Sequence, residues 1–200
     1  MSVLEKKYGD LLDHPQEFKD IQERVEDITC LVNDLTLMTE LDEVNYWAMD
    51  VFDYYPIIRG FIEGYDETNT HQVSVQSECD VHFIFANPRL FTIALRQVLD
   101  NAVTFTPNGG AICIFLRQQG AYHLIEVVDE GIGMAPDTLA QATHRFYRMD
   151  DAHTKRGFGL GLSMVKRICE IHSSRLIIES TLSEGTRVVL RFVAGDASRL

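Results

Sequence analysis

Two short glycine clusters constrain this chain more than any other feature of its sequence. The first, residues 129–133 (DEGIG), directly follows an apolar run typical of a β-strand; the second, residues 157–162 (GFGLGL), directly precedes a pattern typical of a helix. Glycine allows positive φ and lets a ligand approach the backbone closely. Because the second cluster opens onto a helix N-terminus, free N–H groups and the helix dipole favour a bound phosphate there.

The clusters differ from the best-known phosphate-binding motifs. The first continues as Met134-Ala135-Pro136 and the second lacks a preceding strand, so neither is the GxGxxG dinucleotide fingerprint. No Gly-Lys-Ser/Thr follows either cluster, which excludes a P-loop. We therefore expect a phosphate site of another class.

Four cations lie between the clusters: Arg145, Arg148, Lys155 and Arg156. They are dense for a chain with a formal net charge of −12, and cations beside a phosphate loop suit a polyphosphate ligand. The alternative is that they are solvated loop charges, which explains Arg145 and Arg156 equally well when each is taken singly. A long segment without regular structure, bordered by glycines, favours a lid.

The composition is globular and acidic. Hydrophobic residues make up 46% of the chain, which argues against disorder, and 30 Asp+Glu against 18 Lys+Arg argue against a nucleic-acid partner. No apolar run approaches about 18 residues, so we expect no contact with a membrane. Four cysteines without a CxxC pair are expected to be free, small buried hydrophobes in a reducing, cytoplasmic compartment: Cys30, Cys79, Cys113 and Cys169.

Residues 1–42 are predicted to form a separate helical arm. From Pro15 onward, apolar residues recur with the 4-3-4-3 spacing of a coiled-coil seam: Ile21, Val25, Ile28, Val32 and Leu35. An earlier helix is expected to stop near Asp13-His14-Pro15, because the residue before proline disfavours helix. We expect a partial helical hairpin that forms a homodimer; the alternative is that the helix packs only on its own globular domain.

Residues 43–195 alternate strand and helix signals. Strands are expected at 44–49, 71–76, 81–86, 111–117, 122–129, 176–180 and 186–193, and helices at 52–62, 88–105 and 162–171. Asn87-Pro88 predicts a helix start, with asparagine as cap and proline in the first turn. This mixture predicts an α+β fold, a two-layer sandwich with helices on one face of a mixed, mostly antiparallel sheet, followed by a tail at 196–200.

The predicted helix at 88–105 carries two amides among packing residues. Gln97 and Asn101 are four residues apart and therefore share a face. Alone, Asn101 is best explained as a hydrogen-bonded core amide. Beside the glycine loops it becomes a candidate Mg²⁺ ligand, because magnesium takes oxygen ligands together with substrate phosphates.

These elements together resemble the ATP-binding catalytic domain of sensor histidine kinases, the HATPase_c domain of the GHKL superfamily that includes DNA gyrase B and MutL. Five motifs appear in the family's order and cover essentially all of 43–195: the N box at 95–107, the G1 box at 129–133, the F box at 145–150, the G2 box at 157–162 and a glycine-threonine element at 184–186. Each is weak alone, and together they are specific. The resemblance implies the Bergerat ATPase fold, with ATP and Mg²⁺ as cofactors.

The resemblance also implies roles for individual residues. Asp129 would accept a hydrogen bond from the adenine amino group, with Thr186 nearby. Asn101, with Gln97, would bind Mg²⁺. The remaining implied nucleotide-binding residues line the two loops and the lid between them: Gly131, Gly133, Phe146, Arg148, Gly157, Gly159, Leu160 and Gly161. Asn101, Arg148 and Lys155 would be the catalytic residues, acting through positioning and charge neutralisation.

In the family, a histidine on a dimerisation hairpin accepts the phosphoryl group and passes it to the receiver domain of a response regulator. Residues 15–42 resemble the second helix of that hairpin. The acceptor segment, His followed by an acidic residue and then Arg/Lys-Thr-Pro, is absent, and His14 before Pro15 is predicted to be a turn residue. Either the chain is a fragment of a longer kinase, or the acceptor has been lost in evolution.

Gln97 is the second departure from the family pattern. Histidine kinases usually carry Asn there, and the ATP-hydrolysing relatives carry Glu as general base. A glutamine amide cannot act as a base, so gyrase-like hydrolysis is not expected. The main hypothesis is a kinase module; the alternative is a nucleotide-binding pseudokinase or scaffold that docks a partner through its helical arm. A weaker third is a serine kinase that regulates a sigma factor.

Overall fold

The computed structural model describes residues 15–43, 47–66, 70–148 and 157–196. The chain divides into two compact units, Met1–Glu43 and Val44–Leu200. In the first, the described residues form one long helix, α2 (Pro15–Asp42), as the apolar spacing predicts. All five seam residues are exposed: Ile21, Val25, Ile28, Val32 and Leu35. The predicted earlier helix and its turn at His14 lie outside the described residues.

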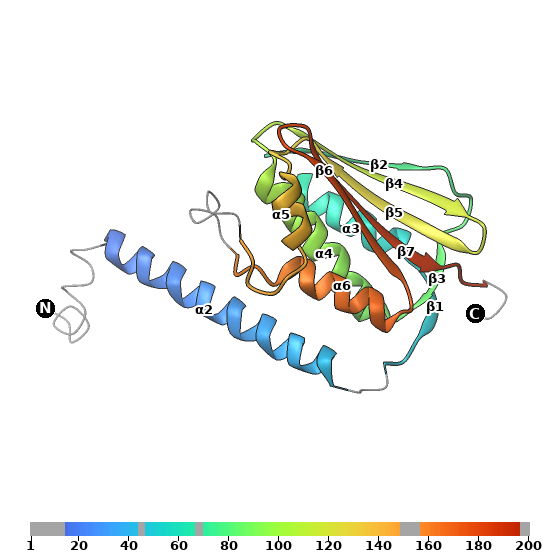
Figure 1. The fold of residues 1–200 in the computed structure, drawn as a ribbon, viewed down its shortest axis with the longest axis horizontal. Helices are drawn as coiled ribbons and strands as arrows, with labels where there is room; N and C mark the ends of the chain where they lie inside the picture. Colours follow the sequence, from blue (N-terminus) through green and yellow to red (C-terminus); the bar gives the residue numbers. More distant parts are fainter. Residues whose placement is uncertain (1–14, 44–46, 67–69, 149–156, 197–200) are drawn as a thin grey trace, which may run out of the picture. The chain divides into compact units, whose positions relative to one another are not determined.

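The second unit is built on a five-stranded sheet (Figure 1). Its strand order is β2 (Gln72–Ser77), β4 (Ala111–Gln119), β5 (Tyr122–Asp129), β7 (Gly185–Val193) and β6 (Arg175–Thr181). β2 runs parallel to β4, and the other neighbours are antiparallel. A separate antiparallel pair joins β1 (Asp50–Asp53) and β3 (Phe83–Ala86).

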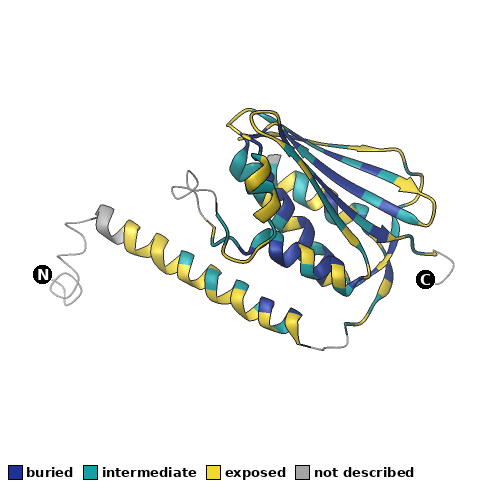
Figure 2. Cartoon of the chain, viewed as in Figure 1, coloured by how far each residue is buried: buried dark blue, intermediate teal, exposed yellow. Residues whose placement is uncertain are grey.

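One face of the sheet is covered by helices α3 (Tyr55–Asp66), α4 (Pro88–Phe105), α5 (Pro136–Gln141) and α6 (Gly161–Ile171) (Figure 1). The register places Ile114, Val127 and Val188 side by side on three neighbouring strands, and all three are buried. Figure 2 shows the buried residues concentrated in α4, α6 and the central strands. The predicted fold class, a two-layer arrangement on a mixed, mostly antiparallel sheet, is confirmed.

The opposite face of the sheet is held together by ion pairs. Glu126, almost fully buried, accepts from Arg117 at 3.2 Å and from Arg187 at 2.8 Å. Arg117 also pairs with Glu78, and Arg187 with Glu179. These ion pairs connect β4, β5, β7 and β6. Removing either arginine would leave the buried charge of Glu126 less compensated, so the pairs stabilise this face of the sheet.

The central helix α4 follows the predicted boundaries. The Asn87 side chain accepts a hydrogen bond from the Leu90 N–H at 3.0 Å, and Pro88 occupies the first turn, where no N–H donor is needed. The helix ends where predicted, before Thr106-Pro107. Seven of its residues are buried: Leu90, Phe91, Ala94, Leu95, Val98, Leu99 and Ala102.

Three predictions near the start of the second unit are wrong. The strand expected at 44–49 is β1 at Asp50–Asp53, because only this segment pairs with β3; residues 44–46 lie outside the described part. The helix expected at 52–62 begins at Tyr55, because the Asp53 carboxylate accepts the Tyr55 N–H at 2.9 Å. The strand expected from residue 81 begins at Phe83. Farther along the chain, the short helix α5 was not predicted.

All four cysteines are free, as expected, but Cys169 alone is buried. Cys79 and Cys113 are half-buried and Cys30 on α2 is exposed, so the prediction that the cysteines are buried is confirmed for Cys169 and wrong for Cys30. Among the described residues, no helix has the length and apolar content required to cross a bilayer.

Candidate functional site

Asp129, at the end of β5, is the centre of the candidate site. Its Oδ1 accepts hydrogen bonds from the backbone N–H of Gly131 at 2.9 Å and of Thr186 at 3.2 Å. Burial raises the pKa of this carboxyl, and the two N–H bonds oppose that rise. Because both bonds end on Oδ1, the second oxygen, Oδ2, receives neither of them. The carboxylate is therefore oriented and retains acceptor capacity for a ligand's N–H donor.

The glycine loop after Asp129 packs backbone against backbone. Gly133 has φ +62°, and a Cβ there would collide with the Thr181 carbonyl. Gly185 has φ +106°, and a Cβ there would collide with the carbonyl of Asp129 itself. Since only glycine meets both requirements without strain, the loop and the β6–β7 turn fix each other.

Ser180 supports the same corner and was not predicted. Its hydroxyl donates to the Gly185 carbonyl at 2.8 Å and lies 2.9 Å from the Thr186 hydroxyl. It also accepts the Met134 N–H at 2.9 Å. Ser180 lies directly opposite Thr186 in the β6–β7 hairpin, so the register around the Ser183-Glu184 turn was the signal that could have identified it.

Gln97 and Asn101 come together with the second glycine cluster. A Cβ on Gly161 would lie 2.7 Å from Gln97 Oε1 and 3.7 Å from Asn101 Nδ2, so both α4 side chains lie against the first turn of α6. Leu160 occupies the cap position, and no side chain caps the helix. The first turn of α6 contains no acidic residue. Among the described residues, the cap position thus supplies no side-chain acceptor for the first-turn N–H groups, a feature that favours a bound anion.

The segment before the second cluster shows backbone strain. Phe146 has φ +64°, rare for a residue with a side chain, and is 60% exposed. Its N–H donates to the Gly159 carbonyl at 2.9 Å. A Cβ on Gly159 would lie 2.5 Å from the Tyr147 carbonyl. The predicted F and G2 elements are thus in contact through their backbones.

The helix α4 links the two halves of the site. The Ile132 N–H in the first loop donates to the Phe105 carbonyl at the end of α4, at 3.1 Å, while Gln97 and Asn101 of the same helix meet α6. Arg148 is half-buried next to the lid segment. Gly157 is exposed, with open space around it. Lys155 and Arg156 lie outside the described residues.

Comparison with known proteins identifies the family. The family model described as "Histidine kinase-, DNA gyrase B-, and HSP90-like ATPase" matches residues 86–195, more than half of the chain. The matched region contains both glycine loops, α4 and the β6–β7 hairpin. The chain belongs to this family of ATP-binding domains.

The more similar relatives are sensor proteins. Drug sensory protein A of Synechocystis sp. is 31% identical over 171 residues, covering 78% of this chain and 26% of that protein. The phosphate regulon sensor protein PhoR of Pseudomonas aeruginosa is 30% identical over 180 residues, covering 84% of this chain and 39% of that protein. The chain therefore spans between about a quarter and two fifths of the length of these two relatives.

Solved structures share the fold. Full-length ShkA in complex with AMPPNP matches with a TM-score of 0.79 and 20% identity, covering 92% of this chain and 40% of that one. The histidine kinase ThkA in complex with the response regulator protein TrrA matches with a TM-score of 0.73 and 15% identity, covering 94% of this chain and 56% of that one. The predicted resemblance to sensor histidine kinases is thus confirmed at the level of family and fold.

Proposed function

We propose that this chain is the ATP-binding catalytic part of a two-component sensor histidine kinase. It transfers the γ-phosphoryl group of ATP to a histidine on a dimerisation hairpin, for relay to the receiver domain of a response regulator. The observation that carries the proposal is the Asp129 carboxylate, buried at a strand end with Oδ1 held by the Gly131 and Thr186 N–H groups. Family membership and the sensor-kinase relatives support it.

In this proposal, Asp129 Oδ2 accepts a hydrogen bond from the adenine amino group. A buried carboxylate fixed by two backbone donors selects a base that presents an N–H donor over one that presents a carbonyl. Gly131 and Gly133 let the base lie against the loop, and Thr186 lies at the edge of the same corner.

The phosphates lie at the first turn of α6. Leu160 and Gly161 supply backbone N–H groups and the positive end of the helix dipole. Arg148 and Lys155 supply positive charge from the lid. Phe146 anchors one edge of the lid on Gly159, and Gly157 provides the hinge at its other end. Phosphoryl transfer needs mainly positioning and charge neutralisation, which these groups provide.

The residues present fit a magnesium ion held largely by the nucleotide. Among the described residues, no group of three or more His, Cys, Asp or Glu side chains could hold a metal by itself. The amide side chains of Asn101 and Gln97 lie beside α6, and amide oxygens are the type of ligand that completes a phosphate-bound Mg²⁺. When bound, the ion would neutralise charge on the phosphates. Gln97 has no titratable group, so it does not activate water, and transfer to an imidazole nitrogen is favoured over hydrolysis.

Different parts of the chain have different roles in this proposal. Residues 43–195 form the catalytic domain, residues 196–200 a tail, and residues 1–42 the dimerisation-like arm, whose exposed seam on α2 joins a second copy. The acceptor histidine belongs to such a hairpin, and the segment acts in the cytoplasm without membrane or nucleic-acid contact. A pseudokinase would retain nucleotide binding without transfer, which the second experiment below detects.

The first experiment measures Mg²⁺-dependent ATP binding by calorimetry, on the full chain and on Asp129→Asn. Asparagine keeps an acceptor for Gly131 and Thr186 but places an amide where the adenine amino group binds. We expect micromolar-to-millimolar binding that weakens at least roughly tenfold in the variant. Equal affinity in the two folded proteins would contradict the assignment of Asp129 as the adenine-binding residue.

The second experiment tests transfer. The full chain is mixed with labelled ATP and a histidine-bearing dimerisation hairpin from a related sensor kinase, and the acid-labile phosphorylation of the hairpin is followed. Asn101→Ala is expected to lower the rate by at least roughly a hundredfold, because magnesium and phosphates are no longer positioned. ATP binding with no transfer to any of several hairpins would favour the pseudokinase.

A further inference from the structure

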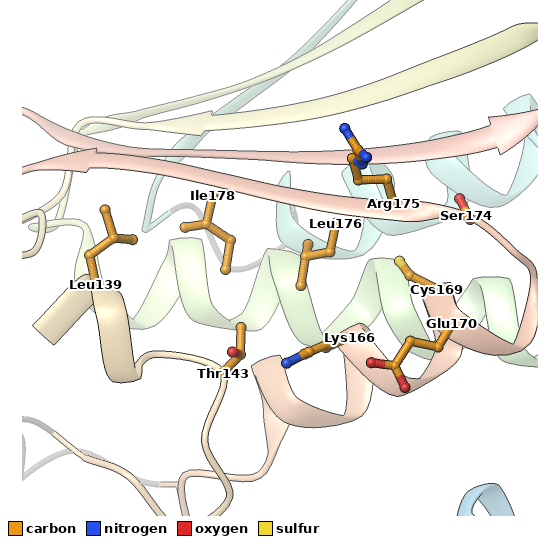
Figure 3. Close-up of a pocket in the computed structure, with 9 residues that line it drawn as sticks. All are labelled: Leu139, Thr143, Lys166, Cys169, Glu170, Ser174, Arg175, Leu176 and Ile178. Carbon is orange, nitrogen blue, oxygen red and sulfur yellow. The ribbon is translucent and has the colours of Figure 1, made fainter.

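A second hollow in the catalytic unit lies away from Asp129, beside the edge strand β6. It has a volume of about 350 Å³ and is bounded by α5, α6 and β6 (Figure 3). Its aliphatic wall consists of Leu139, Leu176 and Ile178, with the Cys169 thiol at one end. Figure 3 shows Lys166, Thr143 and Glu170 along the opposite rim. The hollow therefore combines an apolar wall with a charged rim.

The strand beside this hollow is paired on one side only. β6 pairs with β7, and within the described part of the chain no strand pairs with its other edge. Alternate N–H and C=O groups of an edge strand point outward, where another extended chain can bind them. The Met134 N–H reaches the Ser180 hydroxyl near the C-terminal end of β6, so the accessible part is the half that begins at Arg175.

The charges at this edge favour an acidic partner. Within the described residues, neither Lys166 nor Arg175 has an ion-pair partner, whereas Glu170 already pairs with Arg167 at 3.4 Å. Arg175 lies directly opposite Arg191 in the β6–β7 register, and like charges at facing positions are unfavourable. An incoming carboxylate would relieve this repulsion.

The two faces of β6 select different side chains. Figure 3 shows the guanidinium of Arg175 turned away from the aliphatic wall that Leu176 and Ile178 form. A strand added to β6 would present its own side chains alternately to these two faces. An acidic residue would meet Arg175 on one face, and the adjacent aliphatic residue would enter the hollow on the other.

We propose that the β6 edge and its hollow bind an extended peptide segment in which acidic and aliphatic residues alternate, by addition of a strand to the sheet. The segment belongs to a separate protein partner. Main-chain hydrogen bonds supply affinity, and the Arg175 charge and the aliphatic wall supply specificity. This surface is distinct from the nucleotide site, so the two can be tested separately.

The test uses the full chain without nucleotide and a fluorescently labelled, blocked decapeptide in which glutamate and valine alternate. Binding is followed by anisotropy, and the contact is mapped by NMR shifts of backbone amides. We expect saturable binding with the largest shifts in β6 and at Cys169. Lysine in place of glutamate, serine in place of valine, or N-methylation of alternate backbone amides should each weaken binding at least roughly tenfold.

Variants of the chain make the test specific. Arg175→Glu should weaken the glutamate–valine peptide and strengthen the lysine–valine peptide, while the matched reversal Arg59→Glu on exposed α3 should change neither. Equal binding of the N-methylated peptide, or no binding of the glutamate–valine peptide, overturns the proposal. The proposal is also overturned if decanoate shifts the same amides and the peptide does not, because the hollow would then be a site for small amphiphiles.

Discussion

At the scale of single residues, the site depends on one carboxylate and on glycines that no other residue can replace. Asp129 is buried, and burial raises its pKa. Its Oδ1 is held by two N–H groups, which lower the cost of keeping the charge. Asp129 is therefore both the residue proposed to bind the adenine amino group and a residue whose ionisation depends on its surroundings.

This leads to a pH-dependent affinity. The ionised carboxylate is the better acceptor for the adenine amino group, so protonation weakens binding. As the pH is lowered, we expect the affinity for ATP to fall. Because the pKa of Asp129 is raised, this fall should begin at a higher pH than it would for an aspartate with the ordinary pKa of 3.8. ATP binding measured by calorimetry from pH 7.5 downward should show this loss in the wild-type chain. Asp129→Asn shares the titration of the phosphates, so its remaining pH dependence is the baseline; identical profiles would contradict the prediction.

Gly133 provides a residue-scale test of the backbone packing. Gly133→Ala should cost about 1–2 kcal/mol from the left-handed conformation alone, and more from the collision with Thr181. Gly60, in the interior of α3 with open space around it, is the matched control. Gly60→Ala should stabilise by about 0.5–1 kcal/mol. Chemical denaturation measures both; a loss at Gly133 no larger than the change at Gly60 would refute the packing argument.

At the scale of elements, the C-terminus of α6 has a backbone conformation that suits glycine. At its C-terminus Ser173 takes φ +48°, and the Ser174 N–H donates to the Cys169 carbonyl at 2.8 Å. Glycine is the residue that suits this position. We expect Ser173→Gly to stabilise the chain by about 0.5–1 kcal/mol, and Ser173→Ala to give no such gain because alanine keeps the steric cost. Thermal unfolding of the two variants tests this prediction, and equal melting temperatures would contradict it.

His172 couples the end of α6 to the start of α4. Its Nε2 accepts the Asn87 N–H at 2.9 Å, and its Nδ1 lies 2.7 Å from the Ile168 carbonyl, so the ring is neutral with the proton on Nδ1. Burial lowers its pKa below the ordinary 6.5. The unfolded chain therefore takes up a proton first as pH falls, and stability is lost below about pH 6.5 down through the lowered pKa.

The measurement is the free energy of unfolding from pH 8 to pH 5, in wild type and in His172→Gln, whose amide oxygen can still accept the Asn87 N–H. The buried His123, whose pKa burial also lowers, titrates in both proteins and cancels in the difference. We expect a smaller acid-side loss in the variant. Parallel curves would show that His172 does not carry the effect.

The sequence predicts some elements better than others, for local reasons. The boundaries of α4 were predicted because Asn87-Pro88 and Thr106-Pro107 are strong start and stop signals within the sequence. β1 was misplaced because its position depends on pairing with β3, thirty residues away along the chain, which no local pattern encodes. In the site, the glycines and Asp129 carry motifs, whereas Ser180 acts through hairpin register and has none.

At the scale of the whole molecule, the exposed seam of α2 predicts an assembly. Ile28, 61% exposed, lies at the centre of five apolar residues spaced as in a coiled coil. We expect Ile28→Glu to raise the dimer dissociation constant at least roughly tenfold, because a charge is then buried in the seam. Sedimentation velocity measures it, with Cys30→Glu, which adds a charge at an exposed position away from the seam, as control. Similar dimerisation of both variants would place the interface elsewhere.

The mutual packing of Gly133 and Gly185 affects how large sets of variants are interpreted. Whether or not a nucleotide is bound, each position excludes every side chain because it abuts a backbone carbonyl, of Thr181 for Gly133 and of Asp129 for Gly185. In a saturation library screened only for cellular abundance, both glycines should be depleted as strongly as core positions. Depletion in a growth-based screen would then report lost protein rather than lost catalysis, and the abundance screen separates the two.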